Sequence, residues 1–273
     1  MAPVLSEEKP LTPVRDILPK LHLRLLDLAH PGIEAFFRAA PSPGETLRIA
    51  VKRVLSTLYP PSLASTSAAS AAAPPPVRSV TLNVRTFDGV AHTCGSELDN
   101  EHKEVHLSAS YLAGVSSRCG GNVKEVKHEL EGVLTHELVH VFQYDGRGSV
   151  PGGVIEGIAD WVRGESGLGA QHWHEKVEEG DRWDAGYEKT GFFLRWLSST
   201  LDNPHLVPQL NMGMRSSRWD DGVHLKKLLG GQDVEELWQL YREELEKRDQ
   251  AEEAKAFQPV PTHGASKGYN VQY

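Results

Sequence analysis

The sequence of 273 residues is poor in cysteine and has no long apolar run. Two cysteines are too few for a disulfide-stabilised scaffold, and Cys94 and Cys119 do not form a C-x-x-C pair. The favoured interpretation is two small, buried, free thiols, with a disulfide between them as the alternative. No stretch reaches the roughly 18 consecutive apolar residues that a membrane-spanning helix needs, so no membrane partner is expected.

A basic excess is also absent, because the formal net charge is −8. Nucleic acids and anionic membranes attract proteins with a basic face, so neither is an expected partner. Residues 1–17 contain prolines and early acidic side chains, and we expect a flexible leader there that is not a signal peptide. The sequence has no N-x-S/T glycosylation site, and a cytoplasmic location is the default expectation.

The apolar pattern separates strands from helices along the chain. Alternating apolar residues predict strands, and apolar residues spaced three and four apart predict helices. Strands are expected at 21–28, 78–87 and 104–108. Helices are expected at 45–59, 124–144, 154–167, 187–201, 205–215 and 232–248. Because the strands lie in the first half and the second half is helical, the predicted fold class is α+β.

We expect one catalytic domain over residues 18–248, built from two lobes. Residues 61–76, with the sequence PSLASTSAASAAAPPP, are of low complexity and are expected to form a solvated surface loop within that domain. Residues 249–273 are charged and then contain proline and glycine, which predicts a disordered tail.

The segment HELVH at residues 136–140 carries the strongest chemical signal. Residues four apart lie on one face of a helix, so His136 and His140 can direct both imidazoles at one metal ion. Glu137 lies one step round the helix, where it can act as general base on a metal-activated water. The apolar residues on both sides indicate a buried helix, which argues against a chance match on a solvated face.

A catalytic zinc ion has three protein ligands and one open position. The best candidate for the third ligand is Glu156, in the segment VIEGIADWVR, and Asp160 follows one helical turn later. Asp160 would then accept the other ring N–H of a ligand histidine. Two alternatives remain at this point: Asp160 is itself the third ligand, or both acids simply lie on an exposed first helical turn.

Other candidate ligands are weaker. His128 and Glu129 begin the same motif, but Gly132 stands where the second histidine would be. His172 and His174 have a spacing that can bind metal from a strand, although a place at the surface or the edge of the core is favoured. Core packing is the favoured role of Met212, Met214, Trp183, Trp196 and Trp238.

Three blocks of sequence resemble the plant basic secretory protein family, which comprises peptidases of plants, fungi and bacteria. They are GVLTHELVHVFQYDGRGSVPGGVIEGIADWVR, then GDRWDAGYEKTGFFLRWL, and the stretch from LLGG to LWQLYREEL. The resemblance covers about residues 20–246. It implies a zincin-like fold, with a mixed twisted sheet and the active-site helix in an N-terminal lobe, a mostly helical C-terminal lobe, and a cleft between them.

The family's HExxH motif falls on His136, Glu137 and His140, and its EGIAD segment falls on Glu156 and Asp160. The spacing of the two acids also resembles that of thermolysin-like zincins, in which the first acid binds zinc and the aspartate supports a histidine. The interval between His140 and Glu156 is shorter here than in those enzymes.

Two further residues bear on the class of enzyme. Tyr187 lies in the WDAGY block that resembles the family, and it is a candidate donor to the oxyanion of the reaction. Gly146 stands six residues after His140 and cannot bind metal, which excludes the metzincins. The acidic charge and the start of the sequence depart from the family name, and the resemblance leaves secretion open.

The sequence therefore predicts a zinc metallopeptidase that uses one Zn²⁺ ion to hydrolyse a peptide or protein substrate, with Glu137 as general base. The main alternative is a catalytically silent binding protein that kept the zincin scaffold, in defence or in partner binding. Hydrolysis of a non-peptide amide is a further alternative, because the HExxH motif does not distinguish it.

Overall fold

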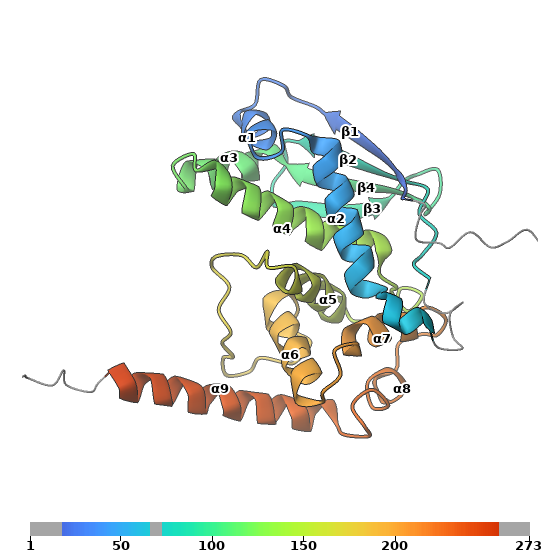
Figure 1. Ribbon diagram of the computed structural model, residues 1–273, viewed down its shortest axis with the longest axis vertical. Helices are drawn as coiled ribbons and strands as arrows, with labels where there is room; N and C mark the ends of the chain where they lie inside the picture. The colour runs from blue at the N-terminus through green and yellow to red at the C-terminus, as the bar shows by residue number, and fades with distance from the viewer. Residues whose placement is uncertain (1–17, 66–72, 257–273) are drawn as a thin grey trace, which may run out of the picture.

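The computed structural model describes residues 18–65 and 73–256, and Figure 1 shows their arrangement. The predicted leader, the middle of the predicted low-complexity loop and the end of the predicted tail lie outside the described residues. Before that gap in the loop, Pro61–Ser65 forms a short 3₁₀ helix, η2.

A four-stranded mixed sheet forms one layer of the N-terminal half. The strands are β1 (Lys20–Leu25), β2 (Ser79–Arg85), β3 (Ala91–Gly95) and β4 (His102–Ser108), and their order in the sheet is β1-β2-β4-β3. The first two strands and β4 run parallel, whereas β3 pairs antiparallel with β4. β3 is therefore an edge strand, with one side of its backbone unpaired in the sheet.

Alternation along the strands explains which face of the sheet is buried. Val80, Leu82 and Val84 alternate along β2 and are fully buried, as are Val105 and Leu107 on β4. These side chains point to one face, where helices cover them (Figure 1). The burial of this apolar face fixes the register of the strands, because a slip by one residue would turn the face toward water.

Four helices belong to this half: α1 (Pro31–Ala39), α2 (Pro43–Leu58), α3 (Ala109–Arg118) and α4 (Val123–Phe142). The last of these contains HELVH, and it begins where the side chain of Asn122 accepts a hydrogen bond from the backbone N–H of Lys124. One core of buried side chains continues from this half into the helices that follow.

The second half is helical, with α5 (Gly152–Glu165), α6 (Tyr187–Thr200), α7 (Leu206–Gly213), α8 (Asp221–His224) and α9 (Val234–Ala256). α5 and α6 lie side by side (Figure 1). Two glycines permit the close approach: Gly157 faces the side chain of Thr190, and Gly191 faces the backbone of α5 at Trp161.

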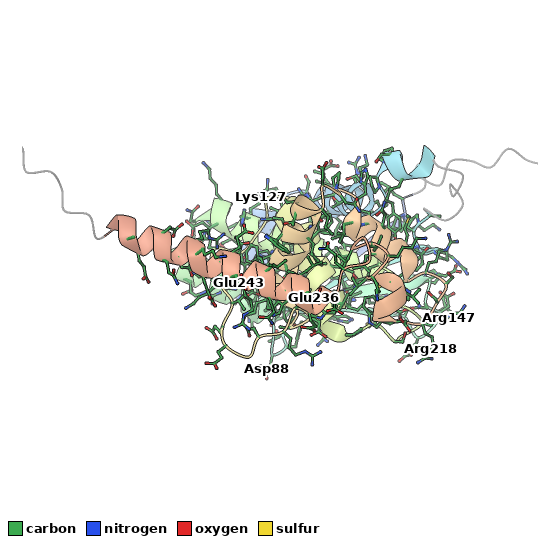
Figure 2. All side chains as sticks on the ribbon, turned by 90° about the horizontal axis from the view of Figure 1, so that it is seen from below. Asp88, Lys127, Arg147, Arg218, Glu236 and Glu243 are labelled. Atoms are coloured by element: carbon green, nitrogen blue, oxygen red, sulfur yellow. The ribbon has the colours of Figure 1, made fainter. Side chains whose placement is uncertain are left out.

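Helix α9 has one buried side and one solvated side. Leu237, Trp238 and Tyr241 are buried, whereas Glu236 and Glu243 project from the ribbon into solvent (Figure 2). This helix also holds the long loop between α5 and α6, because the carboxylate of Glu175 accepts hydrogen bonds from Tyr241 and Arg248. The helix thus fixes a loop that lies far from it in sequence.

The predicted α+β class and mixed sheet are confirmed. Each predicted strand and helix is present with shifted ends, but α1, α3, α8 and β3 were not predicted. The start of α1 carries two signals, since the ring of His30 caps the N–H of Gly32 and Pro31 occupies the first turn. The predicted start of the tail at residue 249 is wrong, because α9 continues to Ala256.

Among the described residues, no helix is both long enough and apolar enough to cross a membrane.

The packing of α5 against α6 can be tested with one methyl group. A Cβ atom at position 157 would lie 2.2 Å from Cγ2 of Thr190. Thr190 cannot easily move, because its hydroxyl bonds to Trp183 O and Gly186 N. We expect Gly157→Ala to lower the free energy of unfolding by about 1–3 kcal/mol, measured by urea denaturation.

The matched control is Gly152→Ala, in the first turn of the same helix, where an added Cβ meets nothing within 4 Å. It should leave the free energy of unfolding unchanged or raise it by up to about 1 kcal/mol. Equal stability of the two variants would contradict the close approach of α5 and α6.

Candidate metal centre

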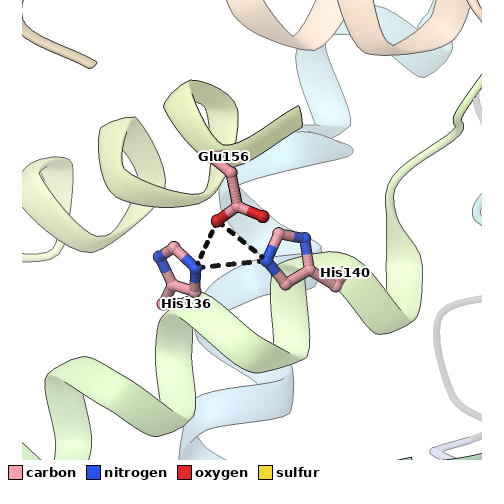
Figure 3. A group of neighbouring side chains, drawn as sticks. All are labelled: His136, His140 and Glu156. Carbon is pink, nitrogen blue, oxygen red and sulfur yellow. Dashed lines mark hydrogen bonds and ion pairs between the residues drawn. The ribbon is translucent and has the colours of Figure 1, made fainter. Parts of the chain in front are cut away.

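Helices α4 and α5 bring three side chains to one point (Figure 3). Nε2 of His136 lies 3.1 Å from Nε2 of His140 and 3.1 Å from Oε2 of Glu156. Nε2 of His140 lies 3.5 Å from the same carboxylate oxygen. Two nitrogens from α4 and one oxygen from α5 therefore form a compact triangle.

The triangle has the dimensions of one face of a metal coordination tetrahedron. Ligand atoms at about 2.0–2.2 Å from a tetrahedral zinc ion lie about 3.3–3.6 Å from one another. The sides of the observed triangle are 3.1, 3.1 and 3.5 Å. These three residues can therefore hold a metal ion and leave a fourth position for another ligand.

Asp160 contacts the opposite side of the first histidine. Its Oδ1 lies 2.6 Å from Nδ1 of His136, and only 4% of its side chain is exposed. A carboxylate in this place accepts the Nδ1–H of a neutral imidazole, which leaves Nε2 as the free lone pair. Among the described residues Glu156, and not Asp160, belongs to the group that can hold a metal ion.

The second histidine has a partner that was not predicted from the sequence. Nε2 of Gln143 lies 2.8 Å from Nδ1 of His140, and Oε1 of the same amide is buried without a hydrogen-bond partner. A half-turn of the amide brings Oε1 to Nδ1, where it accepts the N–H that a metal-bound His140 would carry. Gln143 follows His140 by three residues, and that spacing was the available signal.

The charges of the three side chains stabilise one another. Burial disfavours the charged form of His136, but its hydrogen bonds to Asp160 and Glu156 outweigh burial and raise its pKa to about 9. Burial also acts against the charged form of Glu156, and the two imidazoles overcome it and hold the pKa of that carboxyl well below its usual range. The centre thus attracts positive charge, whether a proton or a metal ion.

Glu137 lies on the same helix and is almost completely buried, with 5% exposure. The hydroxyl of Thr93, on the edge strand β3, lies 2.7 Å from Oε2 of Glu137 and 3.0 Å from its backbone oxygen. Thr93 was not predicted as a site residue, because β3 itself was not predicted. The contact fixes one carboxylate oxygen and leaves Oε1 without a hydrogen bond in the described structure.

Tyr187 opens α6 with an unusual backbone. Its φ angle is +49°, which is a strained conformation for a residue with a side chain. The strain places its ring nearly parallel to that of His136, at 9° and with 6.2 Å between the ring centroids. The charge of Glu156 is the main cause that raises the pKa of the phenol, which keeps it protonated as a donor.

The triangle, Glu137 and Tyr187 all line one cavity of about 930 Å³. The wall on the other side includes Ala91, His92 and Thr93 of the edge strand. The cavity therefore lies between the sheet of the N-terminal half and the helices of the second half.

Comparison with known proteins identifies the family. A family model described as BSP, peptidase of plants and bacteria, matches residues 18–241. The chain belongs to this family. The family membership predicted from the sequence is confirmed, and this family is described as one of peptidases. Searches of curated proteins and of solved structures found no match to the chain.

The HELVH segment of α4 and the EGIAD segment of α5 thus meet in space, whereas the weaker candidates do not belong to the group that can hold a metal ion. His128 bonds to the backbone oxygen of Gly169, and Glu129 forms an ion pair with Arg163. His172 lines the cavity but is not part of the group that can hold a metal ion.

Three side chains that were predicted to pack in the hydrophobic core are buried there: Met214, Trp183 and Trp238. Both cysteines are free, but the expectation that both are buried is wrong: Cys94 is exposed on β3, where alternation turns its side chain away from the core.

The affinity for a metal ion should depend on pH. In the metal-free protein the pKa of His136 is about 9, above its ordinary 6.5, so its proton stabilises the fold below about pH 6.5 and this contribution disappears as pH rises through 9. A metal ion needs the neutral imidazole, so zinc affinity should rise about tenfold per pH unit up to about pH 9 and then level off.

Titration of the metal-free protein with zinc in competition with an indicator dye, between about pH 6 and 10, measures this slope. Asp160→Ala removes a hydrogen bond that raises this pKa, so the levelling should move to lower pH. An affinity that is constant between about pH 7 and 9 would contradict the coupling.

Proposed function

We propose that the protein is a zinc-dependent metallopeptidase of zincin-like architecture. The observation that carries the proposal is the triangle of His136, His140 and Glu156, with Glu137 beside it in the same cavity. Membership of a peptidase family supports the same conclusion.

The donor set favours zinc. Two imidazole nitrogens and one carboxylate oxygen form the ligand set of many hydrolytic zinc sites, and the open fourth position distinguishes a catalytic site from a structural one. Asp160 and Gln143 support one histidine each through Nδ1. Such partners fix the tautomer and the ring orientation, so the ligand atoms are held ready for one ion.

In this proposal each residue of the site has a separate role in hydrolysis. When bound, zinc lowers the pKa of a water molecule and polarises the scissile carbonyl. Glu137 accepts a proton from the attacking water and delivers it to the leaving amine nitrogen. Because Thr93 holds Oε2 of Glu137, Oε1 is the atom available for proton transfer.

Tyr187 is the proposed donor to the developing oxyanion. Its phenol stays protonated, and its ring already lies over that of His136. A donor fixed by a strained backbone needs little rearrangement in the transition state, which is how such groups accelerate acyl transfer.

The edge strand supports a peptide rather than a small amide as substrate. Ala91, His92 and Thr93 of β3 line the cavity, and the backbone of this strand is unpaired in the sheet on its outer side. An extended peptide can add its own backbone hydrogen bonds to such an edge. The presence of the ligands, the base and the donor in one cavity favours hydrolysis over a catalytically silent scaffold.

Replacement of the base tests the mechanism. We expect Glu137→Gln to retain one zinc ion per chain and to lower kcat by about 10²–10⁴-fold, since the amide cannot take a proton. Zinc content is measured by atomic emission and cleavage by mass spectrometry of a peptide mixture. Glu131→Gln is the matched control, because it makes the same change on the same helix outside the cavity. Wild-type protein that lacks zinc after zinc-replete expression would refute the proposal.

Removal of a single hydroxyl tests the oxyanion donor. We expect Tyr187→Phe to lower kcat by about 10²–10³-fold with little change in KM, because the phenol acts only in the transition state. Steady-state kinetics of the zinc-loaded variant give both values. A change confined to KM would assign Tyr187 to substrate binding instead.

A further inference from the structure

The cavity continues past the metal centre in both directions along α4. Glu129 lies about 10 Å before His136 along the helix axis, at a rise of about 1.5 Å per residue. After His140 the wall continues through Val141 and Gln143 to Tyr144 and Asp145, beyond the end of the helix. The metal centre is therefore near the middle of a groove, not at its end.

On the side of the groove toward the N-terminal end of α4, contacts among four side chains define the wall. Glu129 accepts hydrogen bonds from Tyr111 at 2.7 Å and from Arg163 at 2.9 Å. The guanidinium of Arg163 lies over the ring of Trp173, and all four side chains line the cavity. The charge of Arg163 is neutralised by Glu129, so it is not a free anchor for the carboxylate at the end of a peptide.

A second set of contacts defines the opposite side. The phenol of Tyr144 donates to the backbone oxygen of Ala73, which brings Pro75 and Pro76 to the wall. Asp145 acts electrostatically on Lys103, and both also line the cavity.

An extended peptide advances about 3.3 Å per residue, so the roughly 10 Å before His136 accommodate about three residues. On the second side the lining from Val141 to Asp145 extends the groove past His140. An exopeptidase instead binds a charged terminus one or two residues from the scissile bond. We propose that this groove binds an extended polypeptide segment, rich in lysine and arginine, that continues on both sides of the metal centre. The enzyme is then an endopeptidase, an inference that rests on the proposed function.

The preference for positive charge follows from the walls. Besides Glu137 and Glu156, the carboxylates that line the cavity are Glu101, Glu129, Asp145, Asp160 and Glu188. The cationic residues of the lining are Lys103 and Arg163. Within the described structure Asp145 and Glu188 form no hydrogen bond or ion pair through their carboxylates. Asp145 acts electrostatically on Lys103, which leaves Glu188 as the carboxylate most available to a cationic substrate. Rim charges of this kind select partners and speed association.

A set of matched peptides tests the proposal with the zinc-loaded, full-length protein. The central four positions are randomised and the flanks carry lysine or glutamate, in octapeptides whose ends are either acetylated and amidated or free. We expect cleavage within the blocked lysine octapeptides, at a kcat/KM at least about tenfold above that of blocked tripeptides and several-fold above that of the glutamate set. Products released only stepwise from a free end would overturn endopeptidase action, and equal rates for both flanks would overturn the charge preference.

Two charge reversals locate the preference in the groove. Asp145→Lys and Glu188→Lys should each lower kcat/KM for the lysine octapeptides several-fold and raise it for the glutamate set. Asp88→Lys is the control, since Asp88 projects from the surface (Figure 2) and does not line the cavity. It should leave both rates unchanged. If all three variants have equal effects, the preference for lysine arises from the net charge of the protein. That result would overturn the assignment of the preference to the groove.

Binding separates this inference from the proposed function. The zinc-loaded Glu137→Gln protein should bind the blocked lysine octapeptides, as measured by calorimetry. If the protein hydrolyses peptides with free ends but this variant does not bind the blocked octapeptides, the inference about the groove is overturned and the proposed function is not. Absence of all hydrolysis by the zinc-loaded wild-type protein would overturn the proposed function, and internal cleavage with it.

Discussion

The close approach of α5 to both α4 and α6 is the constraint on which the metal centre depends. The bonds from His136 to Glu156 and Asp160 are 3.1 and 2.6 Å long, and only tight packing of the two helices permits them. Glycine makes the packing possible at each contact. A side chain at Gly132 would meet the guanidinium of Arg163 on α5, and one at Gly157 would meet Thr190 on α6. These glycines thus permit the helix packing that brings His136, His140 and Glu156 together.

The same packing concentrates negative charge. Glu137, Glu156 and Asp160 surround two imidazoles in a partly buried cavity, and like charges at this separation destabilise one another unless a cation lies among them. Without metal, a proton on His136 supplies part of that positive charge. Folding, protonation and metal binding at this centre are therefore expected to be coupled.

Local patterns account for the parts of the structure that were predicted. The four-residue spacing in HELVH places His136 and His140 on one face of any helix, and the burial of that helix follows from its apolar neighbours. The sequence also indicated Glu156 and Asp160, and the resemblance to the family favoured Glu156 over Asp160 as the third ligand. Their roles stayed open because nothing local fixes the angle between α4 and α5. Thr93 could not be predicted, since its contact with Glu137 depends on an edge strand of only five residues with weak alternation.

Other features depend on tertiary packing. The positive φ angle of Tyr187 follows Gly186, which lies against Gly153 of α5, and no sequence pattern marks it. Gln143 has a helical spacing from His140, yet the contact of its amide with Nδ1 of His140 is seen only in the folded structure. The missed helix α1 is a different case, because the cap and the proline at its start were legible in the sequence.

The bond between α9 and the loop that joins α5 to α6 has a consequence for the shape of the groove. Trp173 and His172 form part of the wall of the groove. Glu175 lies two residues after Trp173 in the same loop, and its carboxylate accepts hydrogen bonds from Tyr241 and Arg248 of α9. No described residue of α9 lines the groove itself. The C-terminal helix α9 thus supports one wall of the groove without lining it. A substitution on the buried side of α9 is therefore expected to change the shape of that wall.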